Sequence, residues 1–243
     1  MPEPLLLENL GWPDVAAYLE KDDRIILPTG SCEQHGRHLV FGTDALVPYA
    51  IAQRVSQRTG VLVAPPLNYG MSLHHLVFPG SIALRPETLA HAAEDIMRSL
   101  YQHGFRRVLI LNGHGGNIAA LQCAVQLLGH ELPDLQVRLR QWWREPEVQA
   151  ILQEAFPGQR GGHAAQGETS VVLALRPEVV RLERARHSPE APRPGVLTGA
   201  TFQRYYPHGV IGGDPRQARA EVGERVLETA VSVYARLLEE EWP

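Results

Sequence analysis

The chain is poor in lysine and in long apolar runs. Lys21 is the single lysine among 23 basic residues of the 243-residue sequence, and 27 acidic residues leave a formal net charge of −4. A nucleic-acid-binding protein needs a basic surface, so this balance argues against a nucleic-acid partner. The longest apolar runs, such as Val108 to Leu111, fall far below the roughly 20 residues that span a bilayer. We therefore expect no membrane segment, and the opening Met1-Pro2-Glu3-Pro4 does not resemble a secretory signal.

Cysteine is also scarce. The two cysteines, Cys32 and Cys123, lack the spacing of a metal site, and they predict a reducing, cytoplasmic location rather than a disulfide framework. Hydrophobic residues make up 44% of the chain, which is enough for a substantial core. No repeat or linker interrupts the sequence, so we expect a single domain over residues 1–243. Histidine is abundant by contrast, with 11 residues.

Strands and helices are predicted to alternate along the first half of the chain. Such alternation is typical of an α/β fold with a mostly parallel central sheet and helices on both faces. Short apolar runs predict strands at residues 24–28, 61–64, 107–111 and 135–142. Helical spacing and end signals predict helices at residues 43–58, 86–103, 118–128, from about 167, and 216–240. The Pro- and Gly-rich stretch 187–215 is expected to wrap the surface or a neighbouring subunit.

Polar side chains gather in three segments that follow predicted strands or open predicted helices. The first segment carries Glu33, His35 and Asp44, the second is the glycine-rich loop around His114, and the third carries His163 and Glu168. Ligands of open α/β sheets bind outside the carboxyl ends of the strands, so these groups are expected to converge. Carboxylates and imidazoles at one edge match a binuclear site for zinc, manganese or iron, with the short Asp44 as the natural bridge.

Each of these residues also has a simpler interpretation. Asp44 and Glu168 could cap the helices that follow them, and His114 could be incidental to a tight turn. A different class of protein, a non-catalytic nucleotide-binding α/β protein, would use Gly113 to Gly116 as an anion loop. That loop lacks the G-x-G-x-x-G spacing and a Walker lysine, and this alternative leaves the carboxylates unexplained. A metal-binding relative that has lost catalysis is a third alternative.

At these residues the sequence resembles the creatininase (creatinine amidohydrolase) family. The resemblance rests on G-S-C-E-Q-H-G-x-H-L from Gly30 with Thr43-Asp44, on N-G-H-G-G-N from Asn112, and on H-A-A-Q-G-E-T-S from His163. A fourth block, Tyr69-Gly70-Met71-Ser72 with His75 and Phe78-Pro79-Gly80-Ser81, resembles the substrate loop of the family. The blocks follow the order of the family over roughly residues 30–170.

The resemblance implies a three-layer α/β/α fold, two divalent metal ions per subunit, hydrolysis of an amide carbon–nitrogen bond in a small-molecule substrate, and a homo-oligomer, often a hexamer. Carried over by position, Glu33 and His114 would bind one metal ion and His35 and Glu168 the other, with Asp44 bridging them. His163 would carry the proton, and Glu168 belongs to the expected catalytic residues as well.

One position departs from creatininase proper, in which a glutamate ligand stands where this chain has Gly116. Glu168 is therefore expected to complete the second metal site, and creatinine is not the expected substrate. The G-H-G-G-N form looks more like the relatives that hydrolyse formamides in flavin or deazaflavin biosynthesis, or that trim a precursor peptide. Ser72, His75 and Trp143 are expected to contact the substrate, although the pair Trp142-Trp143 could equally belong to the core or to a subunit interface.

Overall fold

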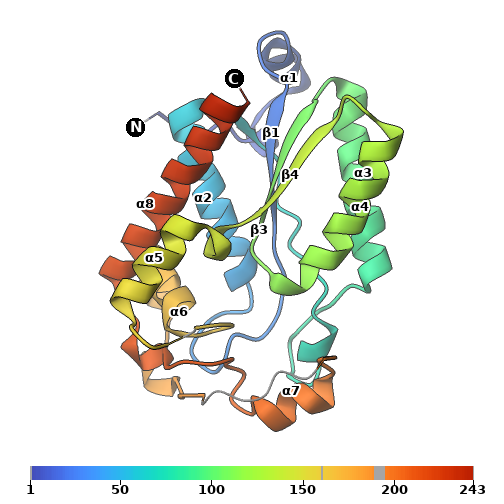
Figure 1. Ribbon diagram of the computed structural model, residues 1–243. Helices are drawn as coiled ribbons and strands as arrows, with labels where there is room; N and C mark the ends of the chain where they lie inside the picture. The colour runs from blue at the N-terminus through green and yellow to red at the C-terminus, as the bar shows by residue number, and fades with distance from the viewer. Residues whose placement is uncertain (1, 160, 189–194, 243) are drawn as a thin grey trace.

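The sheet is the centre of the molecule. A computed structural model describes residues 2–159, 161–188 and 195–242 of the chain. Every strand in this part of the chain is parallel to its neighbours (Figure 1). The spatial order is β2 (Leu62–Val63), β1 (Arg24–Thr29), β3 (Arg107–Asn112) and β4 (Gln136–Gln141). Each strand lies at the apolar run that predicts it.

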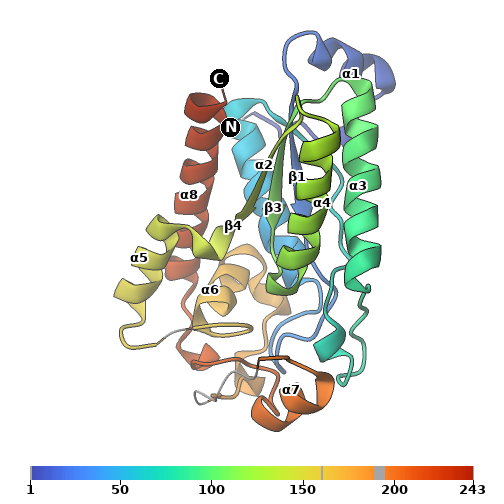
Figure 2. The same cartoon turned by 45° about the vertical axis from the view of Figure 1, so that its right-hand side comes forward.

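Helices cover both faces of the sheet (Figure 1 and Figure 2). On one face lie α2 (Thr43–Thr59), α5 (Pro146–Ala155), α6 (Gln166–Leu175) and α8 (Ala220–Arg236). On the other face lie α3 (Pro86–His103) and α4 (Ile118–Glu131). Ile26 packs into the first layer and Ile25 and Leu27 into the second, because successive side chains of a strand point to opposite faces. The predicted three-layer α/β/α fold is confirmed.

The burial of the strands follows their place in the sheet. Val108 to Leu111 of β3 are fully buried, as a central parallel strand with helices on both faces requires. Strand β4 lies at the edge, where Val137 and Leu139 pack against the layer of α3 and α4. Arg140, which follows Leu139 and points to the opposite face, makes a bidentate ion pair with the buried Glu145. The alternation of apolar and polar residues in this strand therefore suits its edge position.

Several helices are missing from the sequence prediction. Helix α1 (Trp12–Leu19) begins with Pro13 and is capped by Asp14, which accepts a hydrogen bond from the Gly11 N–H, and α5 begins at a proline in the same way. Helix α7 (Gly199–Tyr205) lies in the Pro- and Gly-rich stretch expected to wrap the surface or a neighbouring subunit, of which residues 189–194 are outside the described part. The last helix begins at Ala220 because residues 215–217 form a separate turn.

The strand order creates a crevice at one end of the sheet. Strand β1 leads into α2 on one face, whereas its neighbour β3 leads into α4 on the other face. The two connecting loops therefore diverge at the carboxyl ends of adjacent strands, which is where open α/β sheets bind ligands. This end lies at the bottom of Figure 1, near α6 and α7.

Close contact between α6 and α8 fixes the helix that delivers Glu168. A Cβ atom at Gly223 of α8 would lie 1.9 Å from the backbone oxygen of Ser170 in α6. We expect Gly223→Ala to lower the free energy of unfolding by about 1–3 kcal/mol, because the added methyl group overpacks this contact. Gly129→Ala in α4 is the matched control, since nothing lies within 4 Å of its Cβ position. It should raise stability by about 0.5–1 kcal/mol. Urea unfolding measures both, and equal losses would contradict the packing argument.

Candidate metal centre

The loop after β1 delivers three of the expected site residues. Glu33, His35 and Asp44 are all buried, and Asp44 lies in the first turn of α2. The loop can pass so closely to α2 because Gly30 has no side chain, and a Cβ there would lie 2.5 Å from the Cα atom of Ala45. This close approach places two carboxylates and an imidazole at the carboxyl end of β1.

The loop after β3 delivers His114 and is braced by asparagines. The Asn112 side chain accepts a hydrogen bond from the His114 N–H at 3.2 Å, and the Asn117 side chain donates to the Gly30 oxygen at 2.9 Å. A Cβ atom at Gly113 would lie only 2.0 Å from the backbone oxygen of Asp44. The two loops are thus in backbone contact, and His114 faces Asp44 as a result.

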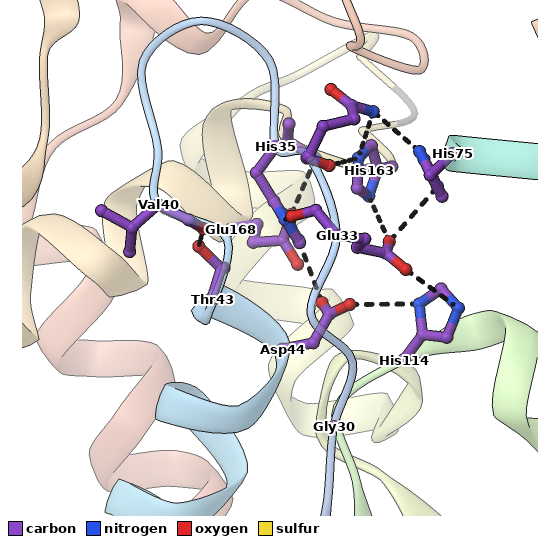
Figure 3. Close-up of polar contacts among 12 residues, drawn as sticks. Gly30, Glu33, His35, Val40, Thr43, Asp44, His75, His114, His163 and Glu168 are labelled. Atoms are coloured by element: carbon purple, nitrogen blue, oxygen red, sulfur yellow. Dashed lines mark hydrogen bonds and ion pairs between the residues drawn. The ribbon is translucent and has the colours of Figure 1, made fainter. Parts of the chain in front are cut away.

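His163 and Glu168 come from the start of α6. Glu168 Oε2 accepts a hydrogen bond from the Ala164 N–H at 2.7 Å, and Ala164 has a positive φ of 55°. This turn directs both side chains toward the loops after β1 and β3 (Figure 3). Glu168 thus stabilises the turn before α6, in line with its simpler interpretation as a helix-capping residue. The same oxygen also lies 3.7 Å from the Nε2 atom of His35.

The carboxylates and imidazoles converge on shared points (Figure 3). Asp44 lies between two histidines, with Oδ1 at 3.0 Å from His35 Nε2 and Oδ2 at 3.1 Å from His114 Nδ1. The described residues contain three groups whose ligand atoms all lie within 4.8 Å of one another. These groups are Glu33–Asp44–His114, His35–Asp44–Glu168 and Glu33–His35–His163. The first two match the two ligand sets expected from the sequence, and Asp44 belongs to both.

Three histidines share one hydrogen-bonding pattern. A ring nitrogen of each lies at hydrogen-bond distance from a backbone oxygen: His35 Nδ1 from Glu33 at 3.0 Å, His114 Nε2 from Met71 at 3.0 Å and His163 Nε2 from Gln34 at 2.7 Å. A carbonyl oxygen can only accept, so we assign the protons to these nitrogens. His163 Nε2 also lies 3.0 Å from the side-chain nitrogen of Gln34, a longer contact than the one to the Gln34 oxygen. The other nitrogen of each ring is left for the carboxylates or for a cation. Metal-binding histidines in proteins are oriented in this way.

The carboxylate oxygens fit a cation equally well. Both side-chain oxygens of Glu33 and Oδ2 of Asp44 are buried without a hydrogen-bond partner. Imidazole nitrogens nevertheless lie near them, with His114 Nε2 at 3.2 Å and His163 Nδ1 at 3.4 Å from Glu33. Buried acceptors without donors are costly, and a cation placed among them would remove that cost. The residues present therefore fit divalent metal ions.

Burial and charge strongly perturb the protonation of these groups. Burial raises the pKa of the Glu33 carboxyl, and it raises the pKa of the Glu168 carboxyl to about 7. Burial opposes the charging of His35, but the carboxylates of Asp44 and Glu168 outweigh it and raise the pKa of this imidazole to about 10. Burial and the nearby charge of His35 hold the pKa of His163 well below its ordinary value. In the protein without metal, protons bound to these groups therefore balance part of the negative charge that a metal ion would balance.

Gln34 is a site residue that the sequence prediction missed. Its side-chain nitrogen lies 2.9 Å from His75 Nδ1 and 3.1 Å from the Gly209 oxygen, and its oxygen accepts from the Gly36 N–H at 2.8 Å. His75 in turn lies with Nε2 at 3.3 Å from Glu33, and burial lowers its pKa well below the ordinary value. The position of Gln34 between Glu33 and His35 in the sequence was the signal that could have identified it as a site residue.

A cavity of about 290 Å³ opens beside the candidate ligands. His75 and Trp143, two of the expected substrate contacts, line it, whereas Ser72 is fully buried and is not among the lining residues. Helix α5 supplies much of the opposite wall of the cavity. Neither this helix nor the wall that it forms was predicted from the sequence. His74 also lines the cavity, and burial lowers its pKa to about 4.

Comparisons with known proteins show which family the chain is similar to. The model of the Creatininase family, described as creatinine amidohydrolase, matches residues 8–238. The creatinine amidohydrolase of Pseudomonas putida is 31% identical over 258 residues, covering 100% of this chain and 99% of that protein. The mycofactocin precursor peptide peptidase of Mycobacterium ulcerans (strain Agy99) is 35% identical over 221 residues, covering 85% and 81%.

A solved structure of a mutant creatininase of the Zn-Zn type superposes with a TM-score of 0.88. The two sequences are 32% identical, and the alignment covers 100% of each chain. At this identity and coverage the likeness extends beyond the fold to the family.

We expect His114 to keep its orientation only when position 116 carries no side chain. A Cβ atom there would lie 2.2 Å from the Met71 oxygen and 2.4 Å from His114 Nε2, the two atoms of the hydrogen bond that orients the ring. We expect Gly116→Ala to weaken zinc binding about 10–100-fold, as loss of an orienting contact does. The control is Gly115→Ala, with nothing within 4 Å of its Cβ position. Zinc titration of the metal-free protein decides, and equal affinities of the two variants would refute the argument.

Proposed function

The chain belongs to the creatininase family of hydrolases that act on carbon–nitrogen bonds, and we propose that it is a two-metal amidohydrolase. The observation that carries the proposal is the sharing of Asp44 between two groups of ligand atoms. Its two oxygens face different histidines, as a bridging carboxylate requires. The catalytic centre would then lie at the crevice between β1 and β3, next to the cavity.

The proposed roles of the ligands follow from the grouping. Glu33 and His114 would hold one divalent ion, His35 and Glu168 would hold the other, and Asp44 would contact both. Zinc, manganese and iron all accept such a set of imidazole and carboxylate ligands. Bound in pairs, such ions lower the pKa of water toward neutrality and polarise the carbonyl group of an amide.

His163 is proposed to move the proton. Its Nε2–H is held by the Gln34 oxygen, so Nδ1 is the atom left to accept a proton and to deliver it to the leaving nitrogen. This atom lies 3.4 Å from Glu33, and the ring lines the cavity, where it can reach a substrate. Burial and the nearby charge of His35 depress the pKa of His163, so without metal the imidazole is neutral and its Nδ1 atom carries a free lone pair.

The alternative of a nucleotide-binding loop is not supported by the charge around it. The His114 loop faces the carboxylates of Glu33 and Asp44, which would repel a phosphate group. A metal-binding relative without catalysis would keep the same ligands, so an activity assay separates it from the proposed enzyme.

The substrate is proposed to be a small amide or a peptide-like molecule other than creatinine. The backbone at Gly116 leaves no room for the side chain that creatininase proper carries there. Assays with creatinine, formylamino-pyrimidines, small lactams and short peptides, each with added Zn²⁺, Mn²⁺ or Fe²⁺, distinguish the candidate activities. We also propose that the protein is a cytoplasmic homo-oligomer. Among the described helices, none combines the length and the apolar character that a membrane span needs.

Removal of the shared carboxylate tests the metal centre. The wild-type protein should contain close to two transition-metal ions per chain by elemental analysis, and Asp44→Ala should lose both metal and hydrolysis because the residue contacts both ligand groups. His91→Ala, an exposed site on α3, is the control and should retain both. A wild-type protein that binds no transition metal, or an Asp44→Ala variant with full metal and activity, would refute the proposal.

Removal of the proton carrier should separate chemistry from metal binding. We expect His163→Ala to lower kcat by roughly 10²–10⁴-fold, the usual contribution of a general acid–base group. Metal content should stay at the wild-type level, since the shared Asp44 and the other proposed ligands remain in place. Steady-state kinetics on the best substrate of the panel, with elemental analysis of the same sample, gives both values. Full kcat in this variant would exclude His163 from the mechanism.

A further inference from the structure

The cavity extends beyond the candidate metal ligands to a wall that the proposed chemistry does not use. This wall lies between α5 and α6 and includes Gln159 and Gln166, with Leu152, Phe156 and Trp143 beside them. A volume of about 290 Å³ is at the small end of ligand pockets, so it suits a small molecule or a short piece of peptide. The polar groups on the wall show what part of such a molecule it could recognise.

Gln166 offers a free hydrogen-bond donor to the cavity. The residue is 2% exposed, and its Oε1 atom accepts a hydrogen bond from the Asp214 N–H at 3.1 Å. That bond fixes which end of the amide is oxygen, because a backbone N–H needs an acceptor. The Nε2 group is left on the side of Gly161, which also lines the cavity. No hydrogen-bond partner for it occurs among the described residues.

Gln159 offers the complementary group. Its Nε2 atom donates to Gln217 at 2.7 Å, whereas its Oε1 atom is buried and has no hydrogen-bond partner. A buried acceptor without a donor is costly unless something supplies the donor. The wall thus presents one unused N–H donor and one unused acceptor.

The rest of the wall argues against a charged ligand group. The described lining residues include no lysine or arginine, and the carboxylates of Glu33, Asp44 and Glu168 lie in the same cavity. A carboxylate or phosphate bound at the wall would therefore have no lysine or arginine among the described lining residues to pair with. A neutral group with both a carbonyl oxygen and an N–H satisfies both glutamines.

We propose that the wall formed by Gln159 and Gln166 is a recognition site for a neutral amide group of the substrate that does not itself react. Gln166 Nε2 donates to the carbonyl oxygen of that group, and Gln159 Oε1 accepts from its N–H. Trp143 and Phe156 provide apolar surface for the adjoining part of the substrate. The inference rests on the proposed amidohydrolase function and adds a second, unreactive amide to the substrate.

The test measures binding of three probes that share one apolar body. These probes are 3-phenylpropanamide, its methyl ester counterpart methyl 3-phenylpropanoate, and the anion 3-phenylpropanoate. Calorimetry gives Kd for the protein as purified and again after treatment with a chelator. We expect the amide to bind about three- to tenfold more tightly than the ester, as one hydrogen bond allows, and the anion to bind most weakly.

Two variants assign the contacts. Gln159→Leu removes the acceptor and should weaken the amide about three- to tenfold without changing the ester, which has no N–H. Gln166→Glu keeps the oxygen that Asp214 needs but replaces the free donor, so it should weaken both amide and ester. Gln153→Leu is the control, because this glutamine also lines the cavity but is exposed on α5. It should bind all probes as the wild type does.

Equal binding of amide and ester by the wild type, absence of saturable amide binding, or unchanged amide affinity in Gln159→Leu would overturn the inference. Circular dichroism and thermal melting check that each variant folds. If Gln166→Glu does not fold, the comparison of amide and ester affinities in Gln159→Leu is sufficient to test the inference. The chelated sample separates this question from the proposed function: a protein without metal-dependent hydrolysis that keeps the binding pattern would refute the enzyme but not the recognition site.

Discussion

The crowding of three carboxylates at one crevice, two of them buried and the third partly buried, is the constraint on which the site depends. Glu33, Asp44 and Glu168 approach the same imidazoles in a region largely closed to water. Like charges at such distances raise one another's cost of ionisation, and burial adds to it. Without metal the burden falls on the imidazoles of His35 and His114, whose pKa values the neighbouring carboxylates raise against the opposing effect of burial. A pair of divalent cations satisfies the same charges more completely, and this is the physical reason for proposing a metal centre.

The backbone around the carboxylates is shaped by the need to bring two loops together. Strands β1 and β3 are hydrogen-bonded neighbours, so the loops that leave them start about one strand spacing apart. They close further because Gly30 and Gly113 allow contact with the backbone of α2. The side chains of Asn112 and Asn117 then tie the loops together with hydrogen bonds. Glycine and asparagine in these motifs thus determine the distance between Asp44 and His114.

The second half of the chain completes the site from the other side. The turn before α6 brings His163 and the first turn of α6 brings Glu168, and the position of this helix depends on tight packing against α8. Phe202 of α7 packs on His75, with ring centroids 4.5 Å apart, so part of the Pro- and Gly-rich stretch closes the site near the proposed substrate residues. Helix α5 forms the far wall of the cavity. The proposed catalysis and recognition would thereby be divided between the sheet edge and the helices that cover it.

Much of the architecture could be predicted from local pattern. The four strands and the helices α2, α3, α4 and α6 have strong periodicity or clear end signals, and parallel order follows from their alternation. Helices α1 and α5 were missed although a proline in the first turn signals each of them, and α7 was missed because it is a seven-residue helix in a Pro- and Gly-rich stretch. Gln34 was missed although it lies inside a recognised motif, because its role consists of contacts to distant residues.

The sequence by itself determined the types of ligand and their order along the chain. Carboxylates and imidazoles after apolar strands already indicate a divalent metal, because the chemistry of the side chains is local. Only the tertiary structure decided that Asp44 faces both His35 and His114, that the two ring nitrogens of His114 face different carboxylates, and that Gln159 and Gln166 keep unused polar atoms. Such facts depend on residues far apart in sequence, whose distances are set by packing across the sheet rather than by any local pattern.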